Sequence, residues 1–162
     1  MTIEDITLDT NVLMHADNPN EIRFEASKSF LERLLEVETH LCIDEGFSLD
    51  EGENKSLIGH EYLQRLSQGG LGYAVISFLA QTGRVAIVEK RIPPAVVNKI
   101  NQLISNKRDK TFIRVAYNST TRTLVSHDFA DFSGVVREKL RKKLCLRIED
   151  AQGVLPELLL RA

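Results

Sequence analysis

The chain is poor in the features that mark secreted, membrane-bound and disulfide-rich proteins. Among its 162 residues there are two cysteines, and no stretch reaches the roughly 20 apolar residues that a membrane helix needs. The N-terminus has no basic segment followed by an apolar run, so we expect a cytoplasmic protein without a membrane partner. We also expect Cys42 and Cys145, each within a short apolar run, to be buried reduced thiols rather than a disulfide or a metal pair.

The sequence has nearly equal numbers of acidic and basic residues, and it contains few histidines. The formal net charge of −2 at pH 7 does not by itself favour a polyanion ligand. The histidines show no H-x-x-x-H spacing, which argues against a zinc site. Charges are nevertheless placed unevenly, with acids crowded at 44–53 and basic runs at 107–114 and 137–143. Each basic run is either a solvated helix face or a surface that follows phosphates.

Strand-type and helix-type patterns alternate along the whole chain. Strand-type runs lie at 3–8, 39–43, 84–88, 121–126 and 144–148. Helical spacing predicts helices from residues 26 and 57, a short one over 73–80, and others from Pro94, Asp109 and about residue 133, with a final turn or helix past Pro156. This order predicts an α/β fold with a parallel sheet. A chain of this length can bury a substantial core as one domain.

Acidic residues follow two of the predicted strands. Asp9 comes directly after the first strand, and Asp128 ends the strand near residue 125. Parallel strands bring such residues to one edge of the sheet, where ligands bind, and a buried acid needs a partner. We therefore expect a shared cation at this edge. Each acid also has a simpler interpretation, Asp9 as a helix N-cap and Asp128 and Asp131 as turn formers.

Two further acids lie on predicted helices. Asp109 precedes apolar residues at 112, 113 and 116, which share its helix face, so it points inward or serves as a helix-start acid. Glu61 lies at the edge of an apolar stripe, and its alternative role is a salt bridge with Arg65.

Taken in order, these motifs resemble the PIN-domain family of metal-dependent ribonucleases. The family pattern is an opening Leu-Asp-Thr-Asn-Val-Leu, a helical Glu, an Asp heading a helix that contains an Ala, and a strand ending Leu-Val-(Ser/Thr)-x-Asp. The chain has these pieces at 8–13, at 60–62, at Asp109 with Ala116, and at 124–128 followed by Asp131. The resemblance covers residues 6 to about 150 and implies a single PIN-like domain over residues 1–162.

The resemblance implies a Rossmann-like, three-layer α/β/α sandwich around the parallel sheet, with an Mg²⁺ or Mn²⁺ site at its carboxyl edge. The implied catalytic and metal-binding residues are Asp9, Glu61, Asp109 and Asp128. Asp131 is a further metal ligand, while Asn11 and Ser126 support the acids, and an acid of the 44–53 loop competes with Glu61. Gathered carboxylates repel one another unless they are neutralised, which agrees with a hard divalent cation.

The implied activity is hydrolysis of RNA phosphodiester bonds by metal-activated water. Kinship with the toxins of toxin–antitoxin modules would add a small antitoxin protein to RNA as a partner, and a homodimer is a family expectation. The alternative is a catalytically silent PIN-like module that binds a protein or RNA. A phosphatase with an Asp nucleophile is a weaker option, because that family has a second Asp where this chain has Asn11.

Overall fold

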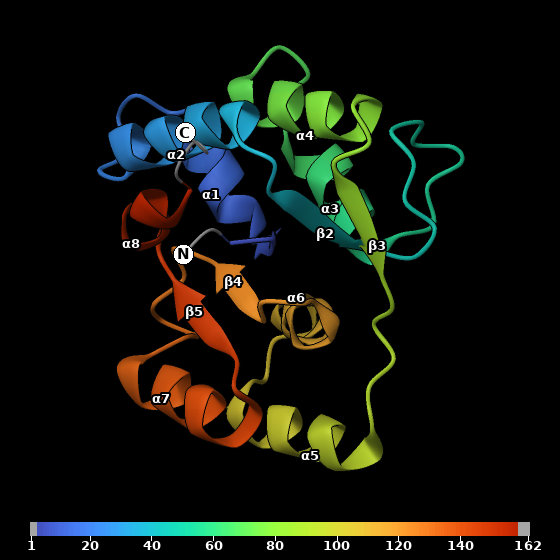
Figure 1. The fold of residues 1–162 in the computed structure, drawn as a ribbon, viewed down its shortest axis with the longest axis vertical. Coiled ribbons are helices and arrows are strands. Elements are labelled where there is room, and N and C mark those ends of the chain that lie inside the picture. The colour runs from blue at the N-terminus through green and yellow to red at the C-terminus, as the bar shows by residue number, and fades with distance from the viewer. Residues whose placement is uncertain (1–2, 159–162) are drawn as a thin grey trace.

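The computed structural model describes residues 3–158 and contains a five-stranded sheet (Figure 1). Its strands are β1 (Asp5–Leu8), β2 (His40–Asp44), β3 (Val85–Val88), β4 (Thr123–Val125) and β5 (Arg147–Glu149). The strand order is β3-β2-β1-β4-β5, and every neighbouring pair is parallel. This confirms the predicted α/β fold with a central parallel sheet.

The inner strands are buried because helices cover both faces of the sheet. All four residues of β1 are buried, including the polar Asp5 and Thr7, as expected of an inner parallel strand that is covered on both faces. At the carboxyl end of β1, Leu8 is in register with Val125 of β4, so the residues that follow these two strands are neighbours. The edge strand β3 is less covered, and Ile87 is 56% exposed.

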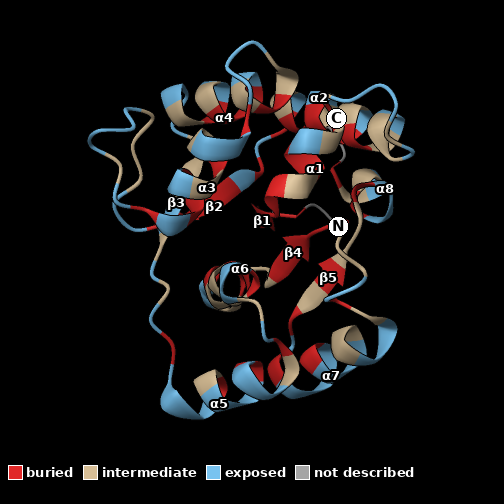
Figure 2. Cartoon of the chain, turned by 180° about the vertical axis from the view of Figure 1, so that it is seen from behind, coloured by how far each residue is buried: buried red, intermediate tan, exposed pale blue. Residues whose placement is uncertain are grey.

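Helices on the two sides of the sheet complete a three-layer α/β/α sandwich. The helices are α1 (Thr10–His15), α2 (Phe24–Glu36), α3 (Leu57–Arg65), α4 (Leu71–Gln81), α5 (Pro94–Leu103), α6 (Lys107–Asn118), α7 (Gly134–Leu144) and α8 (Ala151–Val154), which a short 3-10 turn (Leu155–Glu157) follows. Helices α1, α2 and α4 pack together on one side, and α5, α6 and α7 on the other (Figure 1). Buried residues concentrate on the strands and on the helix sides that face them (Figure 2).

Two helices are anchored where they can carry side chains to the carboxyl edge. Helix α6 packs on β1, β2 and β4, and the side chain of Asn106 caps it by accepting hydrogen bonds from Arg108 N and Asp109 N. Helix α3 packs on β2 and contacts both α1 and α6. Its N-terminus is capped by Ser56 Oγ, which accepts a hydrogen bond of 2.8 Å from Gly59 N.

Helix α4 begins earlier than the predicted start at Tyr73. Asp17 Oδ1 accepts hydrogen bonds from Leu71 N at 2.7 Å and Gly72 N at 3.3 Å, so a side chain distant in sequence caps the helix. Gly72 thereby lies within the helix, where a Cβ would stand 2.9 Å from the carbonyl oxygen of Leu13. The close approach of α4 to α1 explains why glycine occupies this position.

Other expectations differ from the structure in detail. Asp109 is the third residue of its helix rather than the first. Within the described residues, the last α-helix is α8, which Asp150 Oδ1 caps by accepting a hydrogen bond of 2.6 Å from Gly153 N, and the 3-10 turn after it includes Pro156. Most of the segment past Pro156, for which a final turn or helix was predicted, lies outside the described residues. Cys42 is buried as predicted, but the prediction for Cys145 was wrong: it is exposed at the end of α7, with a left-handed backbone (φ 52°).

The predicted domain includes residues 1–2 and 159–162, which lie outside the described residues. Of the helices within 3–158, none combines the length and the apolar character required to cross a membrane.

Candidate metal centre

Four of the five strands lead to an aspartate at the carboxyl edge of the sheet: Asp44 ends β2, Asp9 and Asp150 directly follow β1 and β5, and Asp128 lies three residues after the end of β4. Two of these side chains serve as helix caps. Asp44 accepts hydrogen bonds from Leu57 N and Ile58 N at the start of α3, and Asp150 caps α8. The other two, Asp9 and Asp128, do not cap a helix with their side chains: Asp9 holds the N-cap position of α1 without a side-chain capping bond. The alternative interpretation of Asp9 as a side-chain cap of its helix is therefore wrong.

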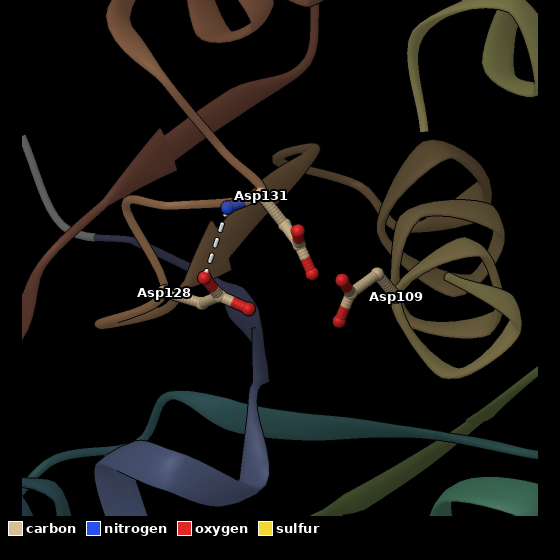
Figure 3. Close-up of side chains that lie close together, drawn as sticks. All are labelled: Asp109, Asp128 and Asp131. Carbon is tan, nitrogen blue, oxygen red and sulfur yellow. Dashed lines mark hydrogen bonds between the residues drawn. The ribbon is translucent and has the colours of Figure 1, made fainter. Parts of the chain in front are cut away.

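Asp128 belongs to a compact cluster with Asp109 and Asp131. One carboxylate oxygen from each of the three lies within 4.8 Å of the others. Asp109 reaches the cluster from α6, opposite Asp128 and Asp131 on the segment between β4 and α7 (Figure 3). Asp131 N donates a hydrogen bond of 3.0 Å to Asp128 Oδ1, which fixes the two acids relative to each other. These are oxygen donors in an arrangement that could hold a divalent metal ion.

Asp109 is the buried member of the cluster, and one of its carboxylate oxygens lacks a group that would compensate its charge. Its Oδ2 atom is inaccessible to solvent and has no hydrogen-bond partner within the described part of the chain. Burial raises the pKa of Asp109 to about 8, with further contributions from a hydrogen bond to Asp131 and from the charges of Asp9 and Asp128. The cluster therefore takes up a proton in the absence of another cation.

Asp9 lies beside this cluster and is only 8% exposed. Ser126 Oγ donates a hydrogen bond of 2.8 Å to Asp9 Oδ2, and Asn11 Nδ2 donates a longer one of 3.4 Å. Burial raises the pKa of Asp9 to about 6; the hydrogen bond from Ser126 lowers it and the charge of Asp128 raises it. A buried acid with such a pKa remains largely ionised at neutral pH.

All four acids of the predicted site line one cleft of about 130 Å³: Asp9, Glu61, Asp109 and Asp128. The two predicted supporting residues also lie at this edge and fix the segment after β4. Asn11 Oδ1 accepts a hydrogen bond of 3.1 Å from His127 N, and Ser126 Oγ accepts one of 3.1 Å from Asp128 N. The structure thus brings together residues from β1–α1, α3, α6 and β4.

Glu61 has partners that the other acids lack. Its Oε1 atom pairs with Arg65 Nε at 2.9 Å and with Arg108 Nη1 at 3.4 Å. The salt bridge to Arg65 considered from the sequence is therefore present, although Glu61 still lines the cleft. Both arginines line the cleft as well. The i, i+4 spacing signalled Arg65, whereas nothing distinguished Arg108 within its basic run.

The acids of the 44–53 loop do not compete for this position. Among the described residues that line the cleft, none comes from this loop. Asp44 is fully buried in its cap, Glu45 Oε1 pairs with Lys90 Nζ at 2.7 Å, and Glu51 Oε1 accepts a hydrogen bond of 2.6 Å from Gln64. The geometry favours Glu61 over these acids.

A histidine pair supports the strand end and was not expected from the sequence. His127 Nε2 accepts a hydrogen bond of 3.2 Å from Ala151 N, and its Nδ1 lies 2.8 Å from His15 Nδ1. Burial lowers the pKa of His127 to about 4, so the ring is neutral at pH 7. Because Nε2 accepts, the proton of the neutral ring lies on Nδ1 and is donated to His15.

The chain matches no model of a known protein family, and no curated protein matches its sequence. The interpretation of the site therefore depends on its geometry and on the chemistry of its side chains.

Proposed function

We propose that this protein is a PIN-like, metal-dependent endoribonuclease that hydrolyses RNA phosphodiester bonds at the acidic cleft. The observation that carries the proposal is the cluster of Asp109, Asp128 and Asp131, with oxygens within 4.8 Å of one another and Asp9 beside it. Asp109 Oδ2 is a buried carboxylate oxygen with no hydrogen-bond partner among residues 3–158, and it supports the binding of a cation at this position. An acidic cluster alone would also suit a purely structural metal, so activity is the property to test.

The donor set fits Mg²⁺ or Mn²⁺ better than a softer ion. The cluster offers carboxylate oxygens, which hard divalent cations prefer, and it contains neither histidine nor cysteine. Asp109, Asp128 and Asp131 would hold the ion, and Asp9 would be a further ligand. When bound, the metal supplies Lewis-acid chemistry and lowers the pKa of its water toward neutrality.

The side chains around the cluster have complementary tasks in this proposal. Ser126 and Asn11 hold Asp9 in one orientation, as groups behind metal ligands commonly do. Arg65 and Arg108 lie at the cleft and provide donors for a phosphate, while Glu61 keeps both guanidinium groups in place. A small antitoxin protein and a homodimer remain predictions from the resemblance.

The test combines metal binding with RNA cleavage. We expect Mn²⁺ to bind the wild-type protein and to support cleavage of an end-labelled single-stranded RNA, and we expect Asp109→Asn and Asp9→Asn to lose both. Asp50→Asn is the control, because Asp50 is an exposed loop acid that does not line the cleft. Unchanged RNA cleavage in Asp109→Asn would contradict the proposal.

One observation favours the second candidate, a catalytically silent module that binds RNA or a protein. Glu61 is already neutralised by two arginines and is not free to bind metal. If that candidate is correct, the wild-type protein will bind RNA without cleaving it at any Mn²⁺ or Mg²⁺ concentration tested, and Asp9→Asn will not change RNA affinity.

A further inference from the structure

A second concavity adjoins the acidic cleft between α3 and α6. This groove has a volume of about 460 Å³, within the range of roughly 300–1,000 Å³ that is typical of small-molecule sites. Glu61, Arg108 and Phe112 line both the groove and the acidic cleft. A ligand that lies in the groove is therefore adjacent to the cluster of acids.

The groove walls are mainly apolar. Leu57, at the first position of α3, is 52% exposed although it is a large aliphatic residue. Behind it, Ile58 and Phe112 are buried and extend the apolar surface inward. The hydroxyl of Thr111 is already engaged, since it donates a hydrogen bond to Lys107 O. The walls suit a flat, largely apolar group rather than a charged one.

The rim of the groove is basic. Lys107 and Arg108 are exposed on the first turn of α6, and His60 contributes an imidazole from α3. The single carboxylate, Glu61, is already paired with two arginines. The positive end of the α6 dipole adds to this potential. The rim therefore favours an anion next to the apolar walls, and it disfavours a basic peptide.

We infer that the groove between α3 and α6 is a nucleobase subsite, which seats one base of a single-stranded RNA while Lys107 and Arg108 contact the adjoining phosphate. An apolar body joined to a phosphate is the chemistry of a nucleotide, and it matches both the walls and the rim. The inference rests on the proposed function, because it places the base beside the phosphate that enters the acidic cleft. It adds to that proposal the position at which the substrate is recognised.

The experiment measures equilibrium binding of a labelled single-stranded oligoribonucleotide in Ca²⁺, with a single abasic residue placed at each position in turn. For wild-type protein we expect one abasic position to weaken binding about tenfold, as losing a seated base commonly does. In Leu57→Gln, we expect the intact RNA to bind more weakly and that same abasic residue to cause little further loss. This non-additivity identifies the base that contacts Leu57.

Matched controls come from exposed residues outside the groove. Val135→Gln replaces an aliphatic residue on α7 that is 65% exposed, and Lys99→Ala, on α5, is compared with Lys107→Ala. Only the groove variants should weaken RNA binding. Suppose that RNA binds and that Leu57→Gln keeps the wild-type affinity and the same response to an abasic residue at each position. The nucleobase subsite is then overturned, while the nuclease proposal stands. A groove that binds a protein partner would give the same result. If no RNA binds to wild-type protein, both proposals are overturned.

Discussion

Ser126 Oγ donates a hydrogen bond of 2.8 Å to Asp9 Oδ2, and this contact joins residues that directly follow β1 and β4. The same hydroxyl oxygen accepts a hydrogen bond of 3.1 Å from Asp128 N. Ser126 is fully buried, so these bonds have no competition from solvent. One serine thereby positions two acids of the cleft.

Replacing this serine should weaken metal binding without removing a ligand. We expect Ser126→Ala to lower Mn²⁺ affinity about 10-fold to 100-fold, because Asp9 loses its orienting donor. Isothermal titration calorimetry measures the effect. Ser27→Ala is the control, since Ser27 is equally buried on α2 but its hydroxyl has no partner within residues 3–158. Equal affinities for the two variants would contradict the role given to Ser126.

The raised pKa of Asp109 predicts how stability depends on pH in metal-free protein. Between about pH 4 and pH 8 the native chain keeps a proton on Asp109 that the unfolded chain has lost. The stabilising contribution of this proton is complete below about pH 4 and disappears as pH rises toward 8. From pH 5 to pH 8 the loss is on the order of 2–4 kcal/mol, because one pKa unit corresponds to about 1.36 kcal/mol.

Urea denaturation in EDTA at both pH values tests this expectation. Asp109→Asn should remove most of the decline, since an amide does not titrate. Parallel pH profiles for the variant and the wild-type protein would show that Asp109 is not the group responsible.

Metal binding should release a proton from the same cluster. Because Asp109 has a pKa of about 8 in metal-free protein, Mn²⁺ must displace its proton at lower pH. We expect the apparent Mn²⁺ affinity to increase up to about tenfold per pH unit between pH 6 and pH 8. Calorimetry in two buffers of different ionisation enthalpy counts the released protons. A pH-independent affinity would be inconsistent with binding at Asp109.

Asp44 should matter for stability and not for metal binding. It is fully buried and accepts hydrogen bonds from Leu57 N at 2.8 Å and Ile58 N at 2.9 Å, so Asp44→Ala leaves these two N–H groups at the start of α3 without their acceptor, although Ser56 still caps Gly59 N. We expect a loss of about 2–4 kcal/mol in the free energy of unfolding. Glu53→Ala, at an exposed loop position, should change it by less than about 0.5 kcal/mol.

A milder variant separates the two roles of Asp44. Asp44→Asn keeps an acceptor oxygen for the α3 cap and should bind Mn²⁺ as the wild-type protein does. Loss of Mn²⁺ binding in folded Asp44→Asn would identify Asp44 as a ligand after all.

The sequence predicted the sheet well because buried parallel strands carry a strong signal. Short runs rich in apolar and β-branched residues can be buried on both faces, and the first four strands begin and end within two residues of their predicted runs. The last strand, β5, is the least well placed: Leu144 ends α7, and the strand begins only at Arg147. The left-handed residue Cys145 causes this shift, and cysteine gives no sequence signal for that backbone, which glycine usually adopts.

The candidate site was predicted less completely than the fold. Strand-end acids can be placed at one edge from topology alone, which is why Asp9 and Asp128 were expected near each other. Which acids join the metal cluster and which form salt bridges depends on contacts in the folded chain. The backbone bond from Asp131 N to Asp128 draws Asp131 into the cluster, and Arg108 reaches Glu61 across two helices. The contact between the helices does not follow from local spacing, whereas the bond between Asp131 and Asp128, three residues apart, is the kind expected of turn-forming aspartates.

Because of the strand order β3-β2-β1-β4-β5, the residues of the candidate site are synthesised in two stages. During synthesis, residues 5–88 can complete one half of the sheet around β1 before β4 and β5 leave the ribosome. Asp9 belongs to this early half, whereas Asp109, Asp128 and Asp131 arrive with the later one. An ion bound by Asp9 together with the later acids would therefore link the second half of the chain to the first, after both have been synthesised.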